Sequence, residues 1–359
     1  PNPDYVKGMV EWCRQFRGLK PDGTVNLCWD VINYHHYAND AGSSQGGNPT
    51  RGSAPEVSDA GERAAAFLAM AHEYCADMPV WLTESGYDLN QGSPLKAIAV
   101  GGRSVEQTQA DWLLRSALSY ARWGVERVFH YQAYDDNPTS SIQFGSMGLL
   151  NSNRSPRLAA QYLQQVQRLL GRYRYQQTLN ADPLVDRYAL NGQSAFMLVV
   201  PDETGRTASY SLNLGTATQA DVYRPQAGST MSVQRVNVTN GQLQLNVTET
   251  PLFVLPVAAA GAPLATTSTT TPKSVELTAY PNPFTNESQV QFKVADSGQA
   301  TLAVYDLQGR LVRKLFAGSM QAQQPRTVLF SGADLPAGLY TLRLTTDTQV
   351  VHQRVVLTK

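Results

Sequence analysis

Apolar residues recur at helical spacing and at strand spacing in alternation over the first 171 residues. Amphipathic helices are predicted at 4–16, from Ser58 to about Cys75, from Ser104 to about Ala121, and after Ser155. Strand-like runs lie between them, at 25–37, 79–84 and 125–134. Strands that alternate with helices in this way predict βα units and a parallel sheet.

Three serines are predicted to begin helices. Ser58 is expected to cap the second helix, and Ser104 with Gln107 has the spacing of a capping box for the third. Ser155 is expected at the N-cap of the fourth helix, with Pro156 at its first helical position.

The pattern changes to short strands and turns from residue 173 to residue 256. The strands expected there are 194–200, 208–214, 219–223, 232–238 and 243–255. Turn residues such as Asn240-Gly241 separate them, so this part is predicted to be an antiparallel sandwich. Residues 257–273 contain few large apolar side chains and are typical of a linker.

Residues 274–359 again alternate apolar and polar positions and predict a second all-β unit. A hairpin is expected over 302–315, turning at Gln308-Gly309, and the run 335–340 is expected to turn the chain into the final strands.

Composition narrows the possible partners. With 29 basic and 29 acidic residues the formal net charge is zero, which argues against a nucleic-acid or anionic-membrane partner. No stretch approaches the ~20 apolar residues of a membrane span. The adjacent His35 and His36 point apart on a strand and are poor metal co-ligands, so no metal site and no cofactor is predicted.

The chain has three cysteines, Cys13, Cys28 and Cys75, which is an odd number and predicts no disulfide framework. Buried small apolar roles are expected for them, and one pair is left able to bridge.

Three motifs near the C-terminus follow one another in a fixed order. They are YPNPF at 280–284, VYDLQGRLV at 304–312 and LPAGLYTLRL at 335–344. Together they resemble the C-terminal sorting domain of the type IX (Por) secretion system of Bacteroidota. The resemblance implies export to the cell surface or beyond, with residues 274–359 binding the secretion machinery. The Tyr-Pro-Asn-Pro run is expected to form a turn at the start of the first strand.

A carboxylate at the end of a strand is the main candidate for chemistry. Val80, Leu82 and Glu84 are expected to share one side of their strand, with the two apolar residues inside a barrel and Glu84 at its rim. The run from Val80 to Asp88 resembles the strand-7 nucleophile motif of the (β/α)8 glycosidases of clan GH-A. The resemblance implies that Glu84 is a catalytic nucleophile. The alternative is a salt-bridged carboxylate at a strand end.

Two further strands carry the same resemblance. Asp30, His35 and Tyr37 match the D-x-x-x-x-H-x-Y pattern of strand 6 in that clan, which implies that His35 and Tyr37 bind the nucleophile and the sugar. Core packing is the alternative for both. The third strand lacks the usual tryptophan, and its candidates for substrate binding are His130, Tyr131, Tyr134 and Asp135.

The fold expected from these patterns is multidomain. A partial (β/α)8 barrel with the last three βα units occupies 1–171, an antiparallel β-sandwich 172–256, a linker 257–273, and an immunoglobulin-like sorting domain 274–359.

The function expected is that of an exported retaining glycosidase acting on a polysaccharide or oligosaccharide, with Glu84 attacking in a double displacement. No Asn-Glu strand end, the clan's acid/base position, precedes Glu84, and the chain begins at Pro1 without Met or a basic leader. The chain is therefore expected to be an inactive fragment. The alternative is a non-catalytic carbohydrate-binding or cell-surface protein exported by the same route.

Overall fold

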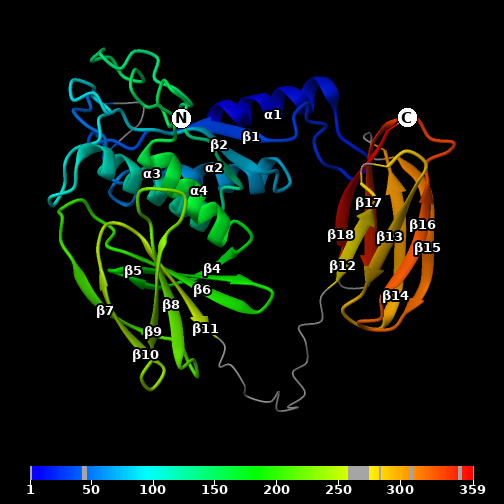
Figure 1. Cartoon of the computed structure of the whole chain (residues 1–359). Helices are drawn as coiled ribbons and strands as arrows, with labels where there is room; N and C mark the ends of the chain where they lie inside the picture. The colour runs from blue at the N-terminus through cyan, green and yellow to red at the C-terminus, as the bar shows by residue number, and fades with distance from the viewer. Residues whose placement is uncertain are drawn as a thin grey trace. The chain divides into compact units, whose positions relative to one another are not determined.

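The computed structural model describes residues 2–42, 47–257, 275–282, 284–306, 310–346 and 350–358. The chain forms two compact units, Pro1–Gly261 and Ala262–Lys359 (Figure 1). Of the predicted linker 257–273, only Val257 is described, and it is the last residue of a strand. The predicted turn residues Gln308 and Gly309 lie outside the described residues.

The first part of unit 1 alternates helices with three short strands. In chain order its elements are α1 (Asp4–Arg17), β1 (Ile32–His35), η1 (Pro55–Val57), α2 (Ala60–Tyr74), β2 (Val80–Glu84), α3 (Val105–Trp123), β3 (Arg127–Val128) and α4 (Leu158–Leu170). The strands form one sheet in the order β1-β2-β3, and both pairings are parallel.

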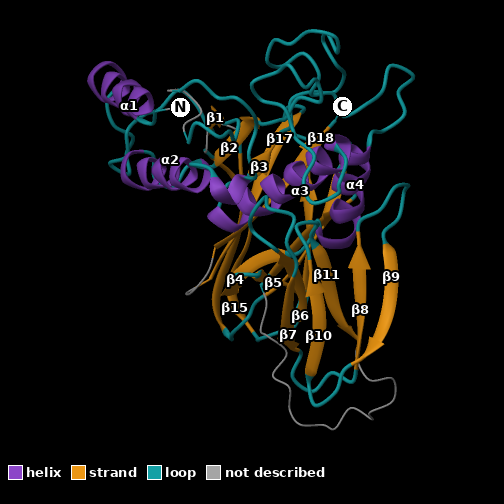
Figure 2. Ribbon diagram, turned by 90° about the vertical axis from the view of Figure 1, so that its left-hand side faces the viewer, coloured by secondary structure: helices purple, strands orange, loops and turns teal. Residues whose placement is uncertain are grey.

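Helices cover one face of this sheet. Ile32 and Tyr34 of β1 and Val80 and Leu82 of β2 are buried in one apolar cluster with the inner side of α2, where Phe67 stacks on Tyr34. Figure 2 shows α2, α3 and α4 between the small sheet and the strands of the sandwich. The apolar spacing of these segments therefore produces the helix layer that the sequence predicts.

The ends of the elements differ from prediction at several points. Ser104 caps α3 by accepting a hydrogen bond from Gln107 N, which confirms that helix start. The prediction for α4 is wrong, because the helix begins at Leu158 with Arg157 as N-cap. The hydroxyl of Ser155 is instead held by Asn153, 2.6 Å away.

The start of α2 and the lengths of two strands also differ. Asp59, not Ser58, is the N-cap residue of α2, although Ser58 Oγ accepts a hydrogen bond from Ala60 N. The runs predicted as strands over 25–37 and 125–134 contain only the four residues of β1 and the two residues of β3. Loops occupy most of both runs.

The second part of unit 1 is an antiparallel sandwich. Its strands are β4 (Arg174–Ala181), β5 (Leu184–Leu190), β6 (Gln193–Val199), β7 (Ala208–Asn213), β8 (Gln219–Arg224), β9 (Ser232–Asn237), β10 (Gln242–Val247) and β11 (Leu252–Val257). Six of them form a sheet in the order β4-β5-β6-β11-β8-β9, and β10 pairs with β7. The sequence did not predict β4 and β5, and the single strand expected over 243–255 is two strands in different sheets.

Unit 2 is a β-sandwich of its own. Its strands are β12 (Glu276–Tyr280), β13 (Glu287–Lys293), β14 (Gly298–Tyr305), β15 (Leu311–Met320), β16 (Arg326–Ser331), β17 (Gly338–Thr346) and β18 (Val350–Leu357). They form two antiparallel sheets, β12-β13-β16 and β15-β14-β17-β18, around a core that includes Phe292, Leu302, Phe330 and Leu342.

Two turn predictions in unit 2 have different outcomes. The Tyr-Pro-Asn-Pro run follows the first strand, because β12 ends at Tyr280, so its placement at the start of that strand is wrong. The run that begins at Leu335 connects β16 to β17, which belong to different sheets. It therefore carries the chain from one layer to the other before the last two strands, as predicted.

Candidate active site

Strand β2 carries one more residue than its neighbours at the end where Glu84 lies. In the pairing with β1, Tyr34 faces Leu82 but the next residue, His35, faces Glu84, so Thr83 has no opposite residue. On the other side, Phe129 N donates to Leu82 O and Tyr131 N donates to Ser85 O, which skips a residue as well. Both neighbours thus show a bulge at the end of β2.

The bulge decides where Glu84 points. Val80 and Leu82 face the helices, whereas Asn33 and His35 of β1 lie on the opposite, open face. Glu84 contacts His35 and therefore lies on the open face too. The prediction that Val80, Leu82 and Glu84 share one side is wrong, because the extra residue changes the alternation of side chains along the strand.

The Glu84 carboxylate is held by two residues of the neighbouring strand and its continuation. Tyr37 Oη donates a hydrogen bond of 2.8 Å to Glu84 Oε2, and His35 Nδ1 lies 3.2 Å from the same oxygen. The Glu84 side chain keeps 33% of its surface exposed, so a ligand can reach the other oxygen. The structure therefore brings together the three residues that the sequence predicted to meet.

Aromatic packing holds Tyr37, the residue that donates a hydrogen bond to Glu84, in place. Tyr37 is buried against Leu95 and Met147, and its ring lies 4.8 Å from that of Phe144. Burial, followed by the hydrogen bond to Glu84, raises the pKa of Tyr37 far above its ordinary value. Tyr37 consequently stays protonated and acts as a hydrogen-bond donor to Glu84.

The segment after Glu84 passes very close to the continuation of β3. A Cβ atom at Gly86 would lie 2.3 Å from Tyr131 O and 2.8 Å from Met147 Sδ. Gly86 is therefore required for this close approach, and its backbone is not in the left-handed region.

Of the residues predicted on the third strand, Tyr131 joins the cluster around Tyr37, whereas His130 lies on the other face of the sheet. His130 points to the side of the helices, where it lines a cavity of about 540 Å³ between α3, α4 and β3. Burial lowers the pKa of His130 to about 4. Tyr131 packs edge-on against Phe144, and Tyr134 is exposed.

Asp135 has its partners within the protein. Its carboxylate is bound by Arg157, with Oδ2 2.5 Å from Nη2, and it accepts a hydrogen bond from Gly148 N. The ion pair of Asp135 with Arg157 joins the loop after β3 to the N-cap residue of α4. A role of Asp135 in holding this loop is thus compatible with its contacts, and its role toward a sugar remains a prediction.

An aromatic pair on the open face of the sheet was not predicted. The Trp81 ring lies 5.9 Å from the Phe129 ring, and the guanidinium of Arg127 lies over Trp81. Phe129 is 45% exposed. Alternation along β2 could have revealed Trp81, had its face been assigned correctly.

Other carboxylates near the ends of these strands are occupied. Asp88 is fully buried and accepts hydrogen bonds from Ser93 Oγ, Phe144 N and both the amide and the hydroxyl of Ser146. Asp59 is bound by His36 and Arg63; burial alone would raise its pKa, but these bonds lower it to about 2. Unlike Asp88 and Asp59, Glu84 at the end of β2 stays partly exposed.

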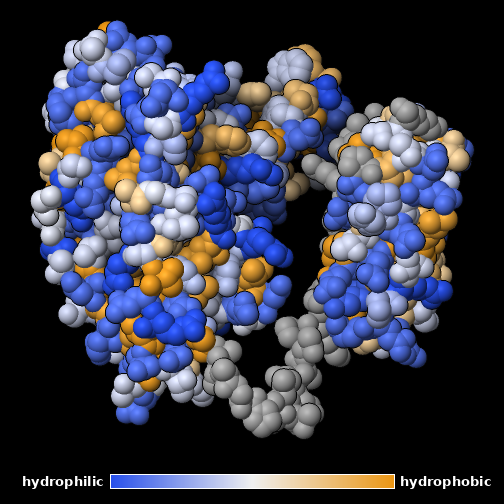
Figure 3. Space-filling view, viewed as in Figure 1, coloured by the Kyte–Doolittle hydropathy of each residue, from blue (hydrophilic) through white to orange (hydrophobic). Residues whose placement is uncertain are grey.

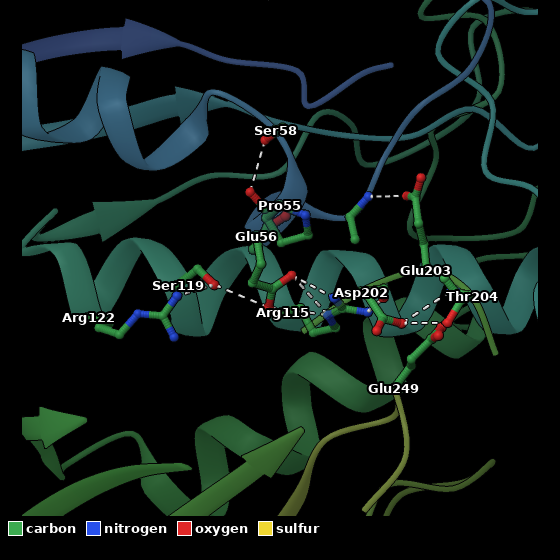
Figure 4. A network of polar contacts seen from close by, with 12 residues as sticks. Pro55, Glu56, Ser58, Arg115, Ser119, Arg122, Asp202, Glu203, Thr204 and Glu249 are labelled. Atoms are coloured by element: carbon green, nitrogen blue, oxygen red, sulfur yellow. Dashed lines mark hydrogen bonds and ion pairs between the residues drawn. The ribbon is translucent and has the colours of Figure 1, made fainter. Parts of the chain in front are cut away.

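A buried polar network joins the helices to the sandwich (Figure 4). Arg115 of α3 binds Glu56 through Nη2 at 2.7 Å and donates to Asp202 O at 2.9 Å. Glu203, next to Asp202, accepts from Arg51 and from Ala54 N. The sandwich is therefore fixed to the loop that follows β1 and to α3, in one unit with the candidate site.

The described residues contain neither a candidate metal site nor a helix that could span a membrane. Among the described residues, no group of three or more His, Cys, Asp or Glu side chains could hold a metal ion. None of the described helices is long and apolar enough to cross a membrane. On the face shown in Figure 3, hydrophobic residues are scattered in small groups among hydrophilic ones.

The C-terminal unit matches a known family. Residues 278–358 match the family described as "Secretion system C-terminal sorting domain". Unit 2 is a type IX sorting domain. Such a domain marks proteins that are exported to the cell surface or beyond, and its presence implies the type IX machinery as a partner. The family match confirms the prediction that was based on the C-terminal motifs.

Several of the solved structures similar to the chain are described as glycoside hydrolases. A family 39 enzyme from the gut symbiont Bacteroides cellulosilyticus WH2 is 18% identical, with a TM-score of 0.50, over 70% of this chain and 47% of the enzyme. A family 30 endoxylanase from Clostridium papyrosolvens C71 is 14% identical, with a TM-score of 0.43, over 72% of this chain and 64% of the enzyme. No curated protein sequence matches significantly.

The likeness to the family 39 enzyme is a likeness of fold. This chain spans about half of the family 39 enzyme, 47% of its length. At 18% identity this likeness shows the fold alone, and the sorting domain marks the chain for export.

Proposed function

We propose that unit 1 is the C-terminal part of a retaining glycoside hydrolase, exported through the type IX system, with Glu84 as its nucleophile. The observation that carries the proposal is the Glu84 carboxylate, open to a ligand at the carboxyl end of a parallel strand and bound through one oxygen by Tyr37 and His35. Carboxyl ends of parallel strands are where barrel enzymes place catalytic groups.

The arrangement suits nucleophilic attack. Because Tyr37 and His35 both contact Oε2, that oxygen is held in place and Oε1 is left to approach an anomeric carbon. The hydrogen bond from Tyr37 stabilises negative charge on Glu84 and fixes the carboxylate plane. His35, half-exposed at 51%, can turn its ring toward a sugar hydroxyl.

A retaining hydrolase needs a second carboxyl about 5–5.5 Å from the nucleophile, first as acid and then as base. Asp88, Asp59 and Asp135 are each engaged in the hydrogen bonds or ion pairs given above. Because no Asn-Glu strand end precedes Glu84, our proposal assigns the acid/base residue to sequence outside residues 1–359, and residues 1–359 alone are expected to be inactive.

Two surfaces support a larger barrel around these three strands. The open face of the sheet carries Asn33, Trp81 and Phe129, which have partly or fully exposed side chains. On α1, exposed Tyr5, Met9, Trp12 and Phe16 follow the spacing of one helix face. Such a stripe on a helix normally packs against further secondary structure. We infer that the three βα units belong to a (β/α)8 barrel.

The experiment that tests this proposal is covalent trapping. The protein encoded by the complete gene, including any sequence before Pro1, is treated with activated 2-deoxy-2-fluoro glycosides that differ in their sugar. The fluorine slows hydrolysis of the glycosyl-enzyme, so the adduct accumulates. Peptide mass spectrometry should locate the adduct on Glu84, and Glu84→Gln should abolish both the adduct and hydrolysis.

Glu126→Gln is the matched control, because Glu126 lies at the opposite end of the neighbouring strand β3 and is exposed. It should retain trapping and turnover. An adduct on another residue, or full activity in Glu84→Gln, would exclude Glu84 as the nucleophile. Sugar binding without adduct or turnover would favour the non-catalytic carbohydrate-binding alternative.

A further inference from the structure

The structure brings two thiols into contact near the N-terminus. Cys13 Sγ and Cys28 Sγ are 4.0 Å apart, although both are free thiols. Cys13 lies in the last part of α1 and is fully buried, whereas Cys28 is exposed and lies four residues before β1 begins. Cys75, the remaining cysteine, is buried and belongs to the cluster around α2.

The contact belongs to an ordered turn. Between the two cysteines, Leu19 and Val25 form an antiparallel bridge, and Asn26 N donates to Gly18 O across 3.0 Å. Arg17 Nε also donates to Asn26 O, at 2.8 Å. Because these bonds hold the two ends of the turn together, the two sulfur atoms stay close in the folded protein. Rotation of the side chains can then bring them to the ~2.05 Å of a disulfide bond.

The destination of the chain supplies the second argument. The sorting domain marks this protein for the cell surface or beyond. Disulfides form and persist in such oxidising surroundings, and they are rare in the reducing cytoplasm. An adjacent pair of thiols in an exported protein is therefore expected to oxidise.

We propose that Cys13 and Cys28 form a disulfide once the chain has left the cytoplasm. The bond ties the end of α1 to the segment that leads into β1, the strand that carries His35. This proposal rests on the sorting domain and on the thiol contact. It does not depend on Glu84 being a nucleophile.

The oxidation proceeds by thiol–disulfide exchange with a disulfide-bearing oxidoreductase. The exposed Cys28 thiolate attacks the disulfide of the oxidant, forming a mixed disulfide and releasing one thiol of the oxidant. Cys13, after losing its proton, attacks Cys28 Sγ and releases the second thiol. Two thiols of this chain thus lose two protons and two electrons, and the disulfide of the oxidant is reduced to a dithiol.

The order of attack follows from exposure. Cys28 is open to solvent, but Cys13 is buried, and burial raises the pKa of the Cys13 thiol. Cys13 is therefore the poorer first nucleophile and reacts when the mixed disulfide already lies beside it.

The test uses protein recovered from outside a bacterium that has a type IX system, alkylated while denatured and digested with trypsin without reduction. Trypsin is expected to release Cys13 in peptide 8–14, Cys28 in peptide 18–51 and Cys75 in peptide 64–96. The expected result is that peptides 8–14 and 18–51 are joined and lose two hydrogen atoms, while the third peptide is alkylated. Alkylation of all three, or a link that involves Cys75, would overturn the proposal.

The Cys28→Ser variant is the control for a structural effect. Cys28 is exposed, so this variant should fold and be exported, with Cys13 and Cys75 both alkylated. Reduction should lower the unfolding temperature of unit 1 in the unaltered protein and leave that of Cys28→Ser unchanged. An equal response of the two proteins to reduction would also contradict the proposal.

Discussion

Tyr37 Oη donates a 2.8 Å hydrogen bond to Glu84 Oε2, joining a residue just beyond β1 to the last residue of β2. The contact depends on the extra residue in β2, because without the bulge at Thr83 the side chain of Glu84 would point to the helices with Leu82. One irregularity in a short strand thus turns a carboxylate from the apolar core to the open face.

Replacing Tyr37 by Phe should weaken the proposed enzyme and leave its fold intact. A hydrogen bond to a charged group contributes about 1.5–3 kcal/mol, so kcat/KM of the complete protein should fall by roughly 10- to 150-fold. Steady-state kinetics of the complete protein measure this effect.

Tyr34→Phe is the matched control for that variant. Tyr34 is stacked on Phe67 at the helix-facing side, and its hydroxyl has no hydrogen-bond partner among the described residues. Its removal should leave kcat/KM unchanged. Equal losses in the two variants would mean that the hydrogen bond from Tyr37 does not support the reaction.

The sequence predicted this site better than it predicted the strand geometry. His35, Tyr37 and Glu84 were brought together by the order of motifs along the chain, and they are in contact in the structure. The reasoning from alternation failed at Thr83, because a bulge leaves no mark in the apolar pattern of a five-residue strand. It consequently assigned Val80 and Leu82 to the wrong face and passed over Trp81.

The helix starts and the strands of the sandwich were also predicted only in part. Ser104 caps its helix as predicted. The hydroxyl of Ser155 instead donates a hydrogen bond to Asn153, and that helix begins at Leu158. Strand β4 was missed because Gln176, Gln177 and Asn180 make its sequence polar, although antiparallel strands with one solvent-facing side tolerate such residues. The residue pattern therefore identified those elements that depend mainly on contacts with residues close to them along the chain.

Gly86→Ala should destabilise unit 1 and disturb the position of Glu84. The added Cβ would lie 2.3 Å from Tyr131 O, so the backbone of one segment must move. Overpacking of this kind costs about 1–3 kcal/mol, which denaturant unfolding can measure. Gly8→Ala in α1 meets nothing within 4 Å and should be neutral or slightly stabilising. A neutral Gly86→Ala variant would show that the close approach is not needed.

Glu56→Gln should be among the most destabilising polar substitutions in unit 1. Arg115 is buried and loses its charged partner, and removing one member of a buried pair costs about 3–5 kcal/mol. The surface pair of Asp221 with Arg235, whose side chain is 57% exposed, supplies the control, and Asp221→Asn should cost under about 1 kcal/mol. Similar losses of unfolding free energy in both variants would show that burial does not set the strength of the Glu56 pair.

Deleting residues 262–359 should stop export without unfolding unit 1, because the two units are separately compact. In a bacterium with a type IX system, the truncated protein should remain with the cells while the full chain appears at the surface or in the medium. Fractionation and immunoblotting measure the distribution. Fusing 262–359 to an unrelated periplasmic reporter should send the reporter out, and unchanged export of the truncated chain would contradict the assignment.

Asp111 should make the stability of unit 1 fall as the pH rises through the weakly acidic range. Burial raises its pKa to about 7, against about 3.9 in the unfolded chain, and the hydrogen bond from Thr250 and the nearby Arg103 offset only part of this effect. The folded state therefore binds the proton more tightly, so this contribution is complete below about pH 4 and is lost as the pH rises toward 7. Asp111→Asn should remove that slope, of at most ~1.4 kcal/mol per pH unit, from the unfolding free energy measured between pH 4 and 7. An unchanged slope in Asp111→Asn would mean that Asp111 is ionised in the folded protein and is stabilised by Arg103 and Arg115.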